Sequence, residues 1–442
     1  MAAFPKLKPL IPSLSAGRDV GLAELGVRGS VRLAQTVATV YPRALKWLLQ
    51  WRQPSPQELR ELFEALGATY IKFGQFIASS PSLFPREYVE EFQSCLDQTP
   101  AIPFDRVRQI VEKELGKPLE AVYASFDQQA LASASIAQVH AARLASGEDV
   151  VVKVQKPGVR EVLTTDMNTV YLLTRLLERI TPNVDRDAVA GLVAEMYQSM
   201  IDECDFVKEA DNLRVFREFL AASGNRQVVA PKPYVQASTS RVLTMERLYG
   251  SALTDPSVLG NTGIDPSESL FNALNTWFAS LTQCPFFHAD LHSGNLLLLR
   301  DGRVGFIDFG MVGRIQPEAW QAMFSLFAGV SEQNYRMMAE AMITVGITRE
   351  AVDVDALTGD IAALFDGLNA MDPAQVLENR GADGINTLMN DLGNIARNYG
   401  IRFPRAFTML LKQFLYFDRY VELLAPGVDV FRDERIDLLL GE

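Results

Sequence analysis

The sequence has little cysteine, little histidine and no long apolar run. Its three cysteines, Cys95, Cys204 and Cys284, lie far apart and form no CxxC pair. This spacing excludes a disulfide framework and a cysteine-based zinc site, so we expect a reducing compartment. No stretch reaches the about 18 uncharged apolar residues of a membrane-spanning helix, and the N-terminus lacks the features of a signal peptide. We therefore expect a cytoplasmic protein, soluble or peripheral to a membrane.

Positive charge is also scarce, except at the N-terminus. The net charge of −12 argues against nucleic acid as a partner, because phosphate binding needs an excess of Lys and Arg. Residues 1–60, however, hold nine Lys and Arg residues against three acids. The stretch Val31–Trp51 mixes apolar residues with basic ones, which suits an anionic membrane surface. A helix packed on its own domain would show the same pattern.

The length and composition predict a globular protein of more than one lobe. Single cores stop growing near about 250–300 residues, and this chain has 442. Apolar residues make up 48% and charged residues 22%, enough for a large core and without a bias toward disorder.

Periodicity predicts a helical first part followed by a mixed region. Apolar residues at helical spacing indicate helices over Gln57–Ser79, Glu87–Leu96 and Phe104–Leu115, the last one closed by Gly116. Strands are indicated at Gln138–Leu144, Val150–Val154, Val228–Val229, Arg241–Met245, Leu296–Leu299 and Val304–Ile307. A long helix is expected within 186–220, and the remainder after Ser267 is expected to be mainly helical.

Two segments late in the chain have the pattern of a phosphoryl-transfer site. In His288–Asn295, Asp290 precedes Asn295 by five positions, and an Asp-Phe-Gly triplet follows at Asp308–Gly310. In the protein-kinase pattern the loop aspartate orients the nucleophile, while the Asn and the later Asp hold Mg²⁺. We therefore predict Asp290 as a catalytic residue, Asn295 and Asp308 as metal ligands, and ATP and Mg²⁺ as cofactors. His288 and His292, without a third ligand nearby, are expected to be structural.

A lysine and a short segment complete this prediction. Lys153 follows three β-branched residues, like the strand lysine that binds the α/β-phosphates and pairs with a helix glutamate. Glu209 is the expected partner, with Glu203 or Asp205 as alternatives. The segment after the strand Arg241–Met245 is expected to form the hinge whose backbone meets adenine; its residues are Met245, Glu246 and Leu248.

Three further motifs are similar to those of the UbiB/AarF (ADCK) atypical protein-kinase-like family. Lys72-Phe73-Gly74-Gln75 resembles its KxGQ motif. Ala132-Ser133-Ala134-Ser135 resembles its alanine-rich nucleotide loop, and Glu203-Cys204-Asp205 resembles its ExD motif. The order and rough spacing also match, over about residues 57–315. The resemblance implies that the KxGQ helix packs over the active site, where Lys72 meets Glu203 and Asp205, and that Glu209 is then left for Lys153.

The resemblance implies an α+β, bilobal protein-kinase-like fold with an N-terminal helical extension packed over the active site. The expected parts are a basic segment (1–56), the KxGQ-type extension (57–125), the N-lobe (126–248) and a mostly helical C-lobe (249–442). It also implies an atypical kinase-like ATPase that supports isoprenoid quinone or prenyl-lipid metabolism, with a prenyl-lipid or quinone precursor and lipid-biosynthetic proteins as partners. Many members have Arg and Asp where this chain has Ser80 and Ser82, so a salt bridge at these positions is missing.

Two alternatives remain open at the level of sequence. Small-molecule kinases of the aminoglycoside or choline kinase type have a similar catalytic loop, although Lys72–Gln75 and the alanine-rich loop count against them. A catalytically silent nucleotide-binding scaffold would carry the same ATP-binding residues. Mg²⁺-dependent ATP hydrolysis, measured with and without lipid vesicles, separates these possibilities.

Overall fold

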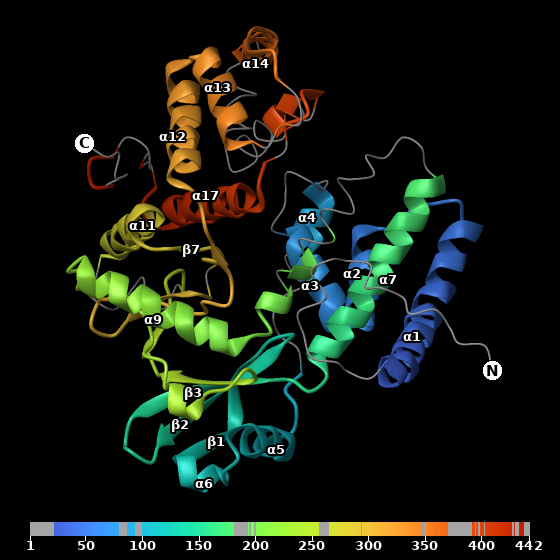
Figure 1. The fold of residues 1–442 in the computed structure, drawn as a ribbon, viewed down its shortest axis with the longest axis vertical. Helices are drawn as coiled ribbons and strands as arrows, with labels where there is room; N and C mark the ends of the chain where they lie inside the picture. The colour runs from blue at the N-terminus through green and yellow to red at the C-terminus, as the bar shows by residue number, and fades with distance from the viewer. Residues whose placement is uncertain are drawn as a thin grey trace.

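The structure of the protein is a computed structural model. It describes residues 22–436 apart from a set of gaps, namely 79–85, 93–99, 181–192, 194–195, 199, 256–264, 293, 347, 349–350, 370–390, 394, 397, 402, 427 and 429–432. Ser80 and Ser82 lie outside the described residues. Figure 1 shows three groups of elements: a sheet at the bottom, a helical group at the right and a larger lobe at the upper left.

The smaller lobe is a four-stranded antiparallel sheet covered by two helices. Its strands, in the order β1-β2-β3-β5, are β1 (Tyr123–Ser133), β2 (Ala137–Leu144), β3 (Asp149–Gln155) and β5 (Val242–Glu246). Val150, Val152 and Val154 are fully buried against α5 (Phe104–Leu115) and α6 (Leu119–Val122). Because side chains alternate along a strand, Lys153 points to the opposite face of the sheet. The valine run therefore fixes the direction of this lysine.

The larger lobe combines short strands with helices around the main core. One sheet has the order β4-β9-β8-β6, and β7 pairs with β10. The strands are β4 (Val228–Val229), β6 (Gly250–Ala252), β7 (Phe287–His288), β8 (Leu296–Leu299), β9 (Val304–Phe306) and β10 (Val312–Gly313). The helices are α9 (Phe206–Ala222), α11 (Pro266–Gln283), α12 (Pro317–Glu332), α13 (Tyr335–Val345), α14 (Val354–Asn369) and α17 (Arg405–Leu424). The 3₁₀ turn η2 (Val235–Ala237) lies before β5 and packs on the smaller lobe.

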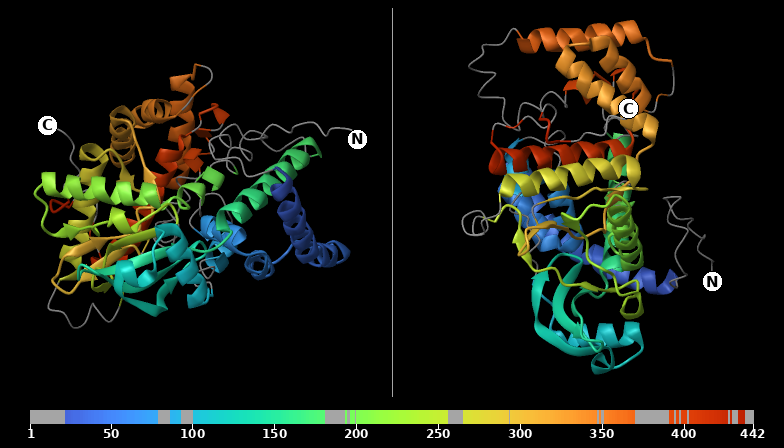
Figure 2. Two further views of the ribbon diagram at one scale, coloured as in Figure 1. Left: turned by 60° about the horizontal axis from the view of Figure 1, so that its bottom comes forward. Right: turned by 90° about the vertical axis from the view of Figure 1, so that its left-hand side faces the viewer.

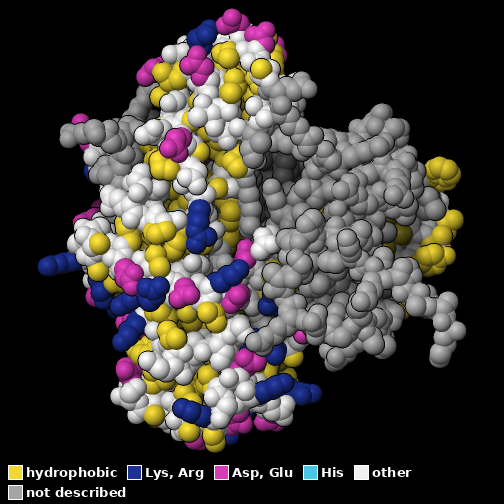
Figure 3. Space-filling model, in the orientation of Figure 1, with side chains coloured by type: hydrophobic (Ala, Val, Ile, Leu, Met, Phe, Trp, Pro, Cys, Tyr) yellow, Lys and Arg dark blue, Asp and Glu magenta, His cyan; other side chains and the backbone are white. Residues whose placement is uncertain are grey.

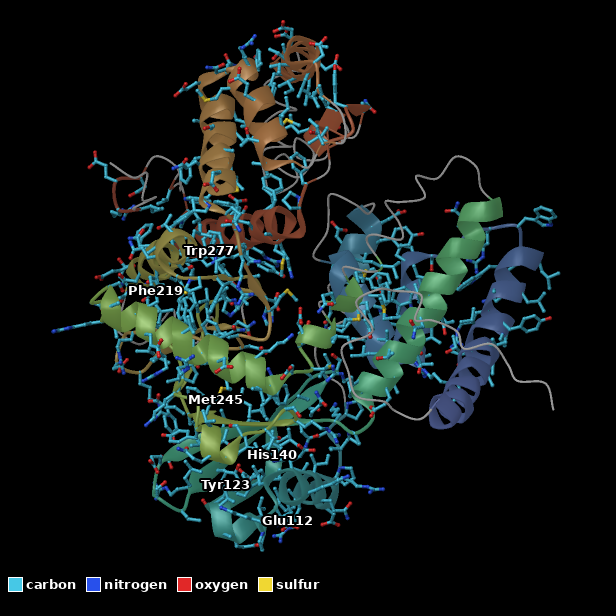
Figure 4. All side chains as sticks on the ribbon, viewed as in Figure 1. Glu112, Tyr123, His140, Phe219, Met245 and Trp277 are labelled. Carbon is cyan, nitrogen blue, oxygen red and sulfur yellow. The ribbon has the colours of Figure 1, made fainter. Side chains whose placement is uncertain are left out.

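Buried aromatic side chains mark the two cores. Trp277 on α11 is fully buried against Phe287 and Phe417, and Phe219 belongs to the same core. Tyr123 belongs to the smaller core, where its hydroxyl group bonds to that of Thr244. Figure 4 shows Tyr123 in the smaller lobe and Trp277 in the larger one, with Met245 between them. The strand β5 thus lies where the two lobes meet.

The third group consists of helices from the first part of the chain together with α7. Its members are α1 (Leu22–Leu49), α2 (Pro56–Leu66), α3 (Ala68–Ala78), α4 (Arg86–Phe92) and α7 (Val159–Ile180). Arg32 of α1 donates two hydrogen bonds of 2.7 Å to the buried carboxylate of Asp166 on α7, which also accepts one from Thr69. In the right-hand view of Figure 2, the orange helices α12–α14 lie at the end of the molecule opposite the sheet. No described helix is long and apolar enough to cross a membrane.

Two expected helices are interrupted. The helix expected over Gln57–Ser79 breaks at Gly67, whose φ of 92° is strained for other residues; α2 ends there and α3 begins. The helix expected within 186–220 is interrupted at 203–205, where Asp205 begins α9 as its N-cap. The helix α5 and its αL cap at Gly116 are as predicted. Helices α5 and α6 and the start of β1 pack on the smaller lobe, although they fall within 57–125.

Candidate active site

Lys153 joins two carboxylates that are far away in the sequence. Its Nζ lies 2.9 Å from Oε2 and 3.0 Å from Oε1 of Glu209, and 3.0 Å from Oδ1 of Asp308. Glu209 lies in the first turn of α9 and is 1% exposed, whereas the Asp308 side chain is 45% exposed. The lysine is thus held between a buried carboxylate and a carboxylate that is nearly half exposed to solvent.

The charges of this triad depend on one another. Burial disfavours the charged form of Lys153, but the carboxylates of Asp308 and Glu209 outweigh it and raise the pKa of the lysine. Burial raises the pKa of Glu209 to about 7, against the attraction of Lys153. Asp308 is also partly desolvated, yet Lys153 lowers its pKa to about 2. Near neutral pH, Lys153 and Asp308 are therefore charged.

The backbone at Asp308 adopts an unusual conformation. Its φ of 59° lies in the left-handed region, which few non-glycine residues occupy. The Gly310 N–H donates to Asp308 Oδ1 at 3.3 Å, and a Cβ at Gly310 would lie only 3.1 Å from this oxygen. Phe309 is buried against Phe216 and its carbonyl accepts a hydrogen bond from Asn212. Contacts on both sides therefore hold the Asp308 carboxylate in place.

The loop that carries Asp290 is connected to the Asp308 segment by backbone and side-chain bonds. The His288 ring contacts the Ile307 carbonyl oxygen through Nε2 at 3.0 Å and accepts the Asp290 N–H at Nδ1. Asn295 Nδ2 donates to the Asp290 carbonyl oxygen at 2.8 Å, and the Ile307 N–H donates to the Asn295 carbonyl oxygen. The β8/β9 hairpin pairs Leu296 with Phe306 and so brings Asn295 beside Asp308.

The histidines have structural contacts. Burial lowers the pKa of His288, so its ring is neutral at neutral pH, with its two nitrogens bonded as described above. His292 Nδ1 accepts the Gly294 N–H at 3.1 Å, and its Nε2 lies 3.8 Å from Asp290 Oδ2. Among the described residues, no cluster of three or more His, Cys, Asp or Glu side chains is arranged to hold a metal ion.

The ExD residues take different positions because the chain turns between them. Lys72 of α3 lies 2.6 Å from Glu203, whose side chain is 18% exposed. Burial raises the pKa of Glu203, while Lys72 lowers it. Asp205 accepts the Val207 N–H at 3.2 Å and caps α9, the helix that carries Glu209. One acid of the motif thus pairs with Lys72 and the other begins the helix behind Lys153.

The alanine-rich loop closes the turn between β1 and β2. Ala132 and Ser133 end β1, and the Ala134 N–H donates to the Ala137 carbonyl oxygen at 2.8 Å. The hydroxyl oxygens of Ser133 and Ser135 are buried and have no hydrogen-bond partner in the described structure. Buried hydroxyl groups normally have partners, so these two are suited to a polar ligand at the turn.

The expected hinge follows β5 at the junction of the lobes. The Glu246 N–H donates to the Lys232 carbonyl oxygen and the Arg247 N–H to that of Asp149. No described residue accepts a hydrogen bond from the Leu248 N–H, and the Leu248 side chain packs near Gly305 of β9. Met245 is buried in the main core. Among the N–H groups of Glu246, Arg247 and Leu248, that of Leu248 is the one open to a ligand.

Comparison with known proteins identifies the family of the chain. Residues 94–342 match the ABC1 atypical kinase-like domain. The chain belongs to this ABC1, or UbiB/AarF, family. It is 44% identical to an uncharacterized chloroplast aarF domain-containing protein kinase of Arabidopsis thaliana, over 93% of this chain and 83% of that protein. The α+β kinase-like fold expected from the sequence is therefore confirmed.

Other similar proteins are more distant. An uncharacterized protein of Mycobacterium tuberculosis is 32% identical over 87% of this chain and 78% of its own length. A chloroplast Arabidopsis thaliana protein named activity of bc1 complex kinase 7 is 29% identical over 85% of this chain and 53% of its own length. A Mycobacterium tuberculosis protein solved with erythromycin aligns with 89% of this chain and 98% of its own, at 23% identity and a TM-score of 0.48.

The sequence did not reveal one charged residue at the site. Lys412 of α17 lies 3.0 Å from Asp290 Oδ1, and both side chains are mostly buried. Its neighbour Gln413 is fully buried and bonds to the backbone of Ala289 and Leu291. The only signal in the sequence is a lysine within an otherwise apolar stretch of helix.

Proposed function

We propose that this protein binds Mg²⁺-ATP at the junction of its lobes and acts as an atypical kinase-like ATPase that supports isoprenoid quinone or prenyl-lipid metabolism. The observation that carries the proposal is the Lys153 ammonium group, held within 3.0 Å of both Glu209 and Asp308. Kinases bind phosphates and metal with this arrangement, in which a glutamate on a helix fixes a lysine on a strand and the lysine faces an aspartate of the other lobe.

The residues at the site suit ATP and Mg²⁺. Mg²⁺ prefers oxygen ligands and is usually held by one or two protein groups together with phosphates. Asp308 offers a carboxylate, and Asn295 offers an amide oxygen because its Nδ2 already donates to Asp290. The unpartnered hydroxyl groups of Ser133 and Ser135 lie at the alanine-rich turn, where they would bond to the nucleotide. When bound, Mg²⁺ would neutralise charge that develops on the phosphoryl oxygens.

The roles of the protein residues follow from their positions. Lys153 would contact the α/β-phosphates while Glu209 keeps it in place. The backbone at Leu248 and Glu246, beside buried Met245, would meet adenine. Asp290 would orient the attacking hydroxyl or water, because its loop is tied to the Asp308 segment through His288 and Asn295.

The helical extension favours a small acceptor. Lys72 of α3 reaches Glu203, and its charge also acts on Asp290 and Asp308. We propose that this extension packs over the active site and excludes a large peptide, so that a small molecule, a lipid headgroup or water receives the phosphoryl group. The quinone or prenyl-lipid precursor itself rests on the family resemblance.

Peripheral membrane association is part of the proposal, and α1 offers a surface for it. Val37, Tyr41, Leu45 and Leu49 repeat every four residues and are exposed, and Trp51 beyond the helix end is 93% exposed. Figure 3 shows hydrophobic side chains at the right-hand edge, where α1 lies in Figure 1. Several basic residues nearby are paired: Arg32 with Asp166, and Lys46 and Arg52 with Glu58. Apolar contact would therefore add to charge in binding an anionic surface.

The test is Mg²⁺-dependent ATP hydrolysis with and without anionic or prenyl-lipid vesicles. We expect slow turnover that lipid accelerates. ATP binding without turnover under every condition would favour a scaffold, and efficient phosphorylation of a soluble small alcohol would favour a small-molecule kinase. Absence of nucleotide binding would contradict the proposal altogether.

A further inference from the structure

Side chains of helix α17 bond to the backbone of the loop that carries Asp290. Gln413 Nε2 donates to the Ala289 carbonyl oxygen at 2.7 Å, and Gln413 Oε1 accepts the Leu291 N–H at 2.8 Å. One side-chain amide thus bonds to the residues on both sides of Asp290. Tyr420 Oη adds a bond of 2.7 Å to the Leu291 carbonyl oxygen. The loop backbone is therefore fixed without any contribution from Lys412.

Lys412 contacts the Asp290 side chain instead. Its Nζ lies 3.0 Å from Oδ1 and 5.4 Å from the centre of the Tyr416 ring. The second oxygen, Oδ2, has His292 Nε2 at 3.8 Å, beyond hydrogen-bond distance, and no described residue donates to it. The carboxylate is thus held at one oxygen and open at the other.

A lysine at this position is costly to the fold. It stands in a helix whose neighbouring side chains, Leu410 and Phe417, are fully buried. A buried ion pair is often no more stabilising than apolar side chains of the same size at both positions, so stability alone does not require a charged pair of Lys412 and Asp290 here. The ion pair with Asp290 therefore points to a role in the function of the loop.

We propose that Lys412 is a positioning residue of the phosphoryl-transfer site. Lys412 binds Asp290 Oδ1 and leaves Oδ2 to accept a hydrogen bond from the hydroxyl group or water that attacks. This inference rests on the proposed function, because it assigns Asp290 to the nucleophile. It adds a residue from the C-terminal helix, 122 positions after Asp290, to a site whose other members lie in sequence motifs.

The test compares Lys412→Met with Lys412→Arg, and with Arg419→Met, which removes an exposed cation from the same helix. We expect Lys412→Met to lower kcat for Mg²⁺-ATP turnover by about 10- to 100-fold, since misplacing a catalytic group by about 1 Å costs on this order. The Kd for Mg²⁺-ATP should stay within about twofold, because Lys412 does not face the nucleotide ligands. Lys412→Arg should recover most of the loss and Arg419→Met should change neither constant.

The kcat of the single variants decides whether Lys412 positions the loop aspartate. An unchanged kcat in Lys412→Met would overturn the proposal. Loss of nucleotide binding together with kcat in Lys412→Met, without rescue by Lys412→Arg, would also overturn it.

A measurement without turnover separates this inference from the proposed function. If the wild-type protein does not hydrolyse ATP, the proposed function fails while the ion pair remains testable by thermal unfolding. Lys412→Met leaves a mostly buried carboxylate without its partner and should lower Tm by several degrees, whereas adding Asp290→Asn should restore part of it. If the change in Tm of the double variant equals the sum of the changes in the two single variants, Lys412 does not hold Asp290.

Discussion

The Lys153 ammonium group donates a hydrogen bond of 3.0 Å to Asp308 across 155 positions of the sequence. The two residues come from different lobes, β3 on one side and the segment after β9 on the other. This bond therefore joins the lobes at the point where phosphates and metal would bind. Glu209 is buried behind the lysine, so the contact between the lobes depends on the charges of Lys153, Glu209 and Asp308 together.

Replacing Lys153 by Met should destabilise the protein in a pH-dependent way. Removal of one partner from a buried ion pair costs about 3 kcal/mol, because a buried charge is left unpaired. The pKa of Glu209 is already raised to about 7 and should rise further without the lysine. A carboxyl group with a raised pKa in the folded state is stabilising when protonated and loses this contribution as the pH rises through that pKa.

The destabilisation by Lys153→Met should therefore be larger at pH 8 than at pH 6, as measured by urea unfolding. Lys113→Met, at an exposed position in the last turn of α5, serves as the control and should change little at either pH. A loss that is the same at both pH values would contradict the coupling between Lys153 and Glu209.

Replacing Lys72 by Ala should change which acceptor receives the phosphoryl group. The variant removes the cation beside Glu203 and the side chain that reaches from α3 into the site. We expect several-fold more phosphate transfer to the protein itself or to an added peptide, measured with labelled ATP. Lys113→Ala should leave this transfer at the wild-type level. A Lys72→Ala protein with the same acceptor preference as wild type would argue against a role of the extension in substrate exclusion.

The exposed apolar face of α1 should govern vesicle binding. Leu45→Ser, Leu49→Ser and Trp51→Ser combined should weaken binding to anionic vesicles by at least about tenfold, since each apolar side chain transferred from water contributes about 1 kcal/mol or more. Val235→Ser, an exposed apolar site on the smaller lobe, is the control. Higher salt should weaken binding of the wild type only in part, because several basic residues of this region are already paired. Unchanged binding of the triple variant in a co-sedimentation assay would rule out this face.

The local parts of the fold could be predicted from the sequence. The valine run before Lys153 gave β3, and the turn at Asp301-Gly302 between two apolar runs gave the β8/β9 hairpin. Alternation and turn chemistry act over a few residues and are visible without the fold. The strand β1 was not predicted, because Asp127 and the two glutamines after it are polar and the pairing with β2 is irregular there.

Contacts between distant elements could not be predicted in this way. The Lys72–Glu203 pair was expected because both residues lie in recognisable motifs. Lys412 lies in no motif, and its contact with Asp290 depends on how α17 packs on the larger lobe. Periodicity shows which face of a helix is buried, but it does not show which loop that face will meet.

Asp308 and Asp290 have different roles in the proposed function: Asp308 holds the metal of Mg²⁺-ATP, whereas Asp290 acts on the nucleophile. The affinity for Mg²⁺-ATP, measured by calorimetric titration of the wild type, Asp308→Asn and Asp290→Asn, separates these roles when turnover is measured in parallel. We predict that Asp308→Asn binds Mg²⁺-ATP at least about tenfold more weakly, while Asp290→Asn binds it nearly as the wild type does and has no turnover. Equal loss of Mg²⁺-ATP binding in both variants, or wild-type binding in Asp308→Asn, would contradict the account.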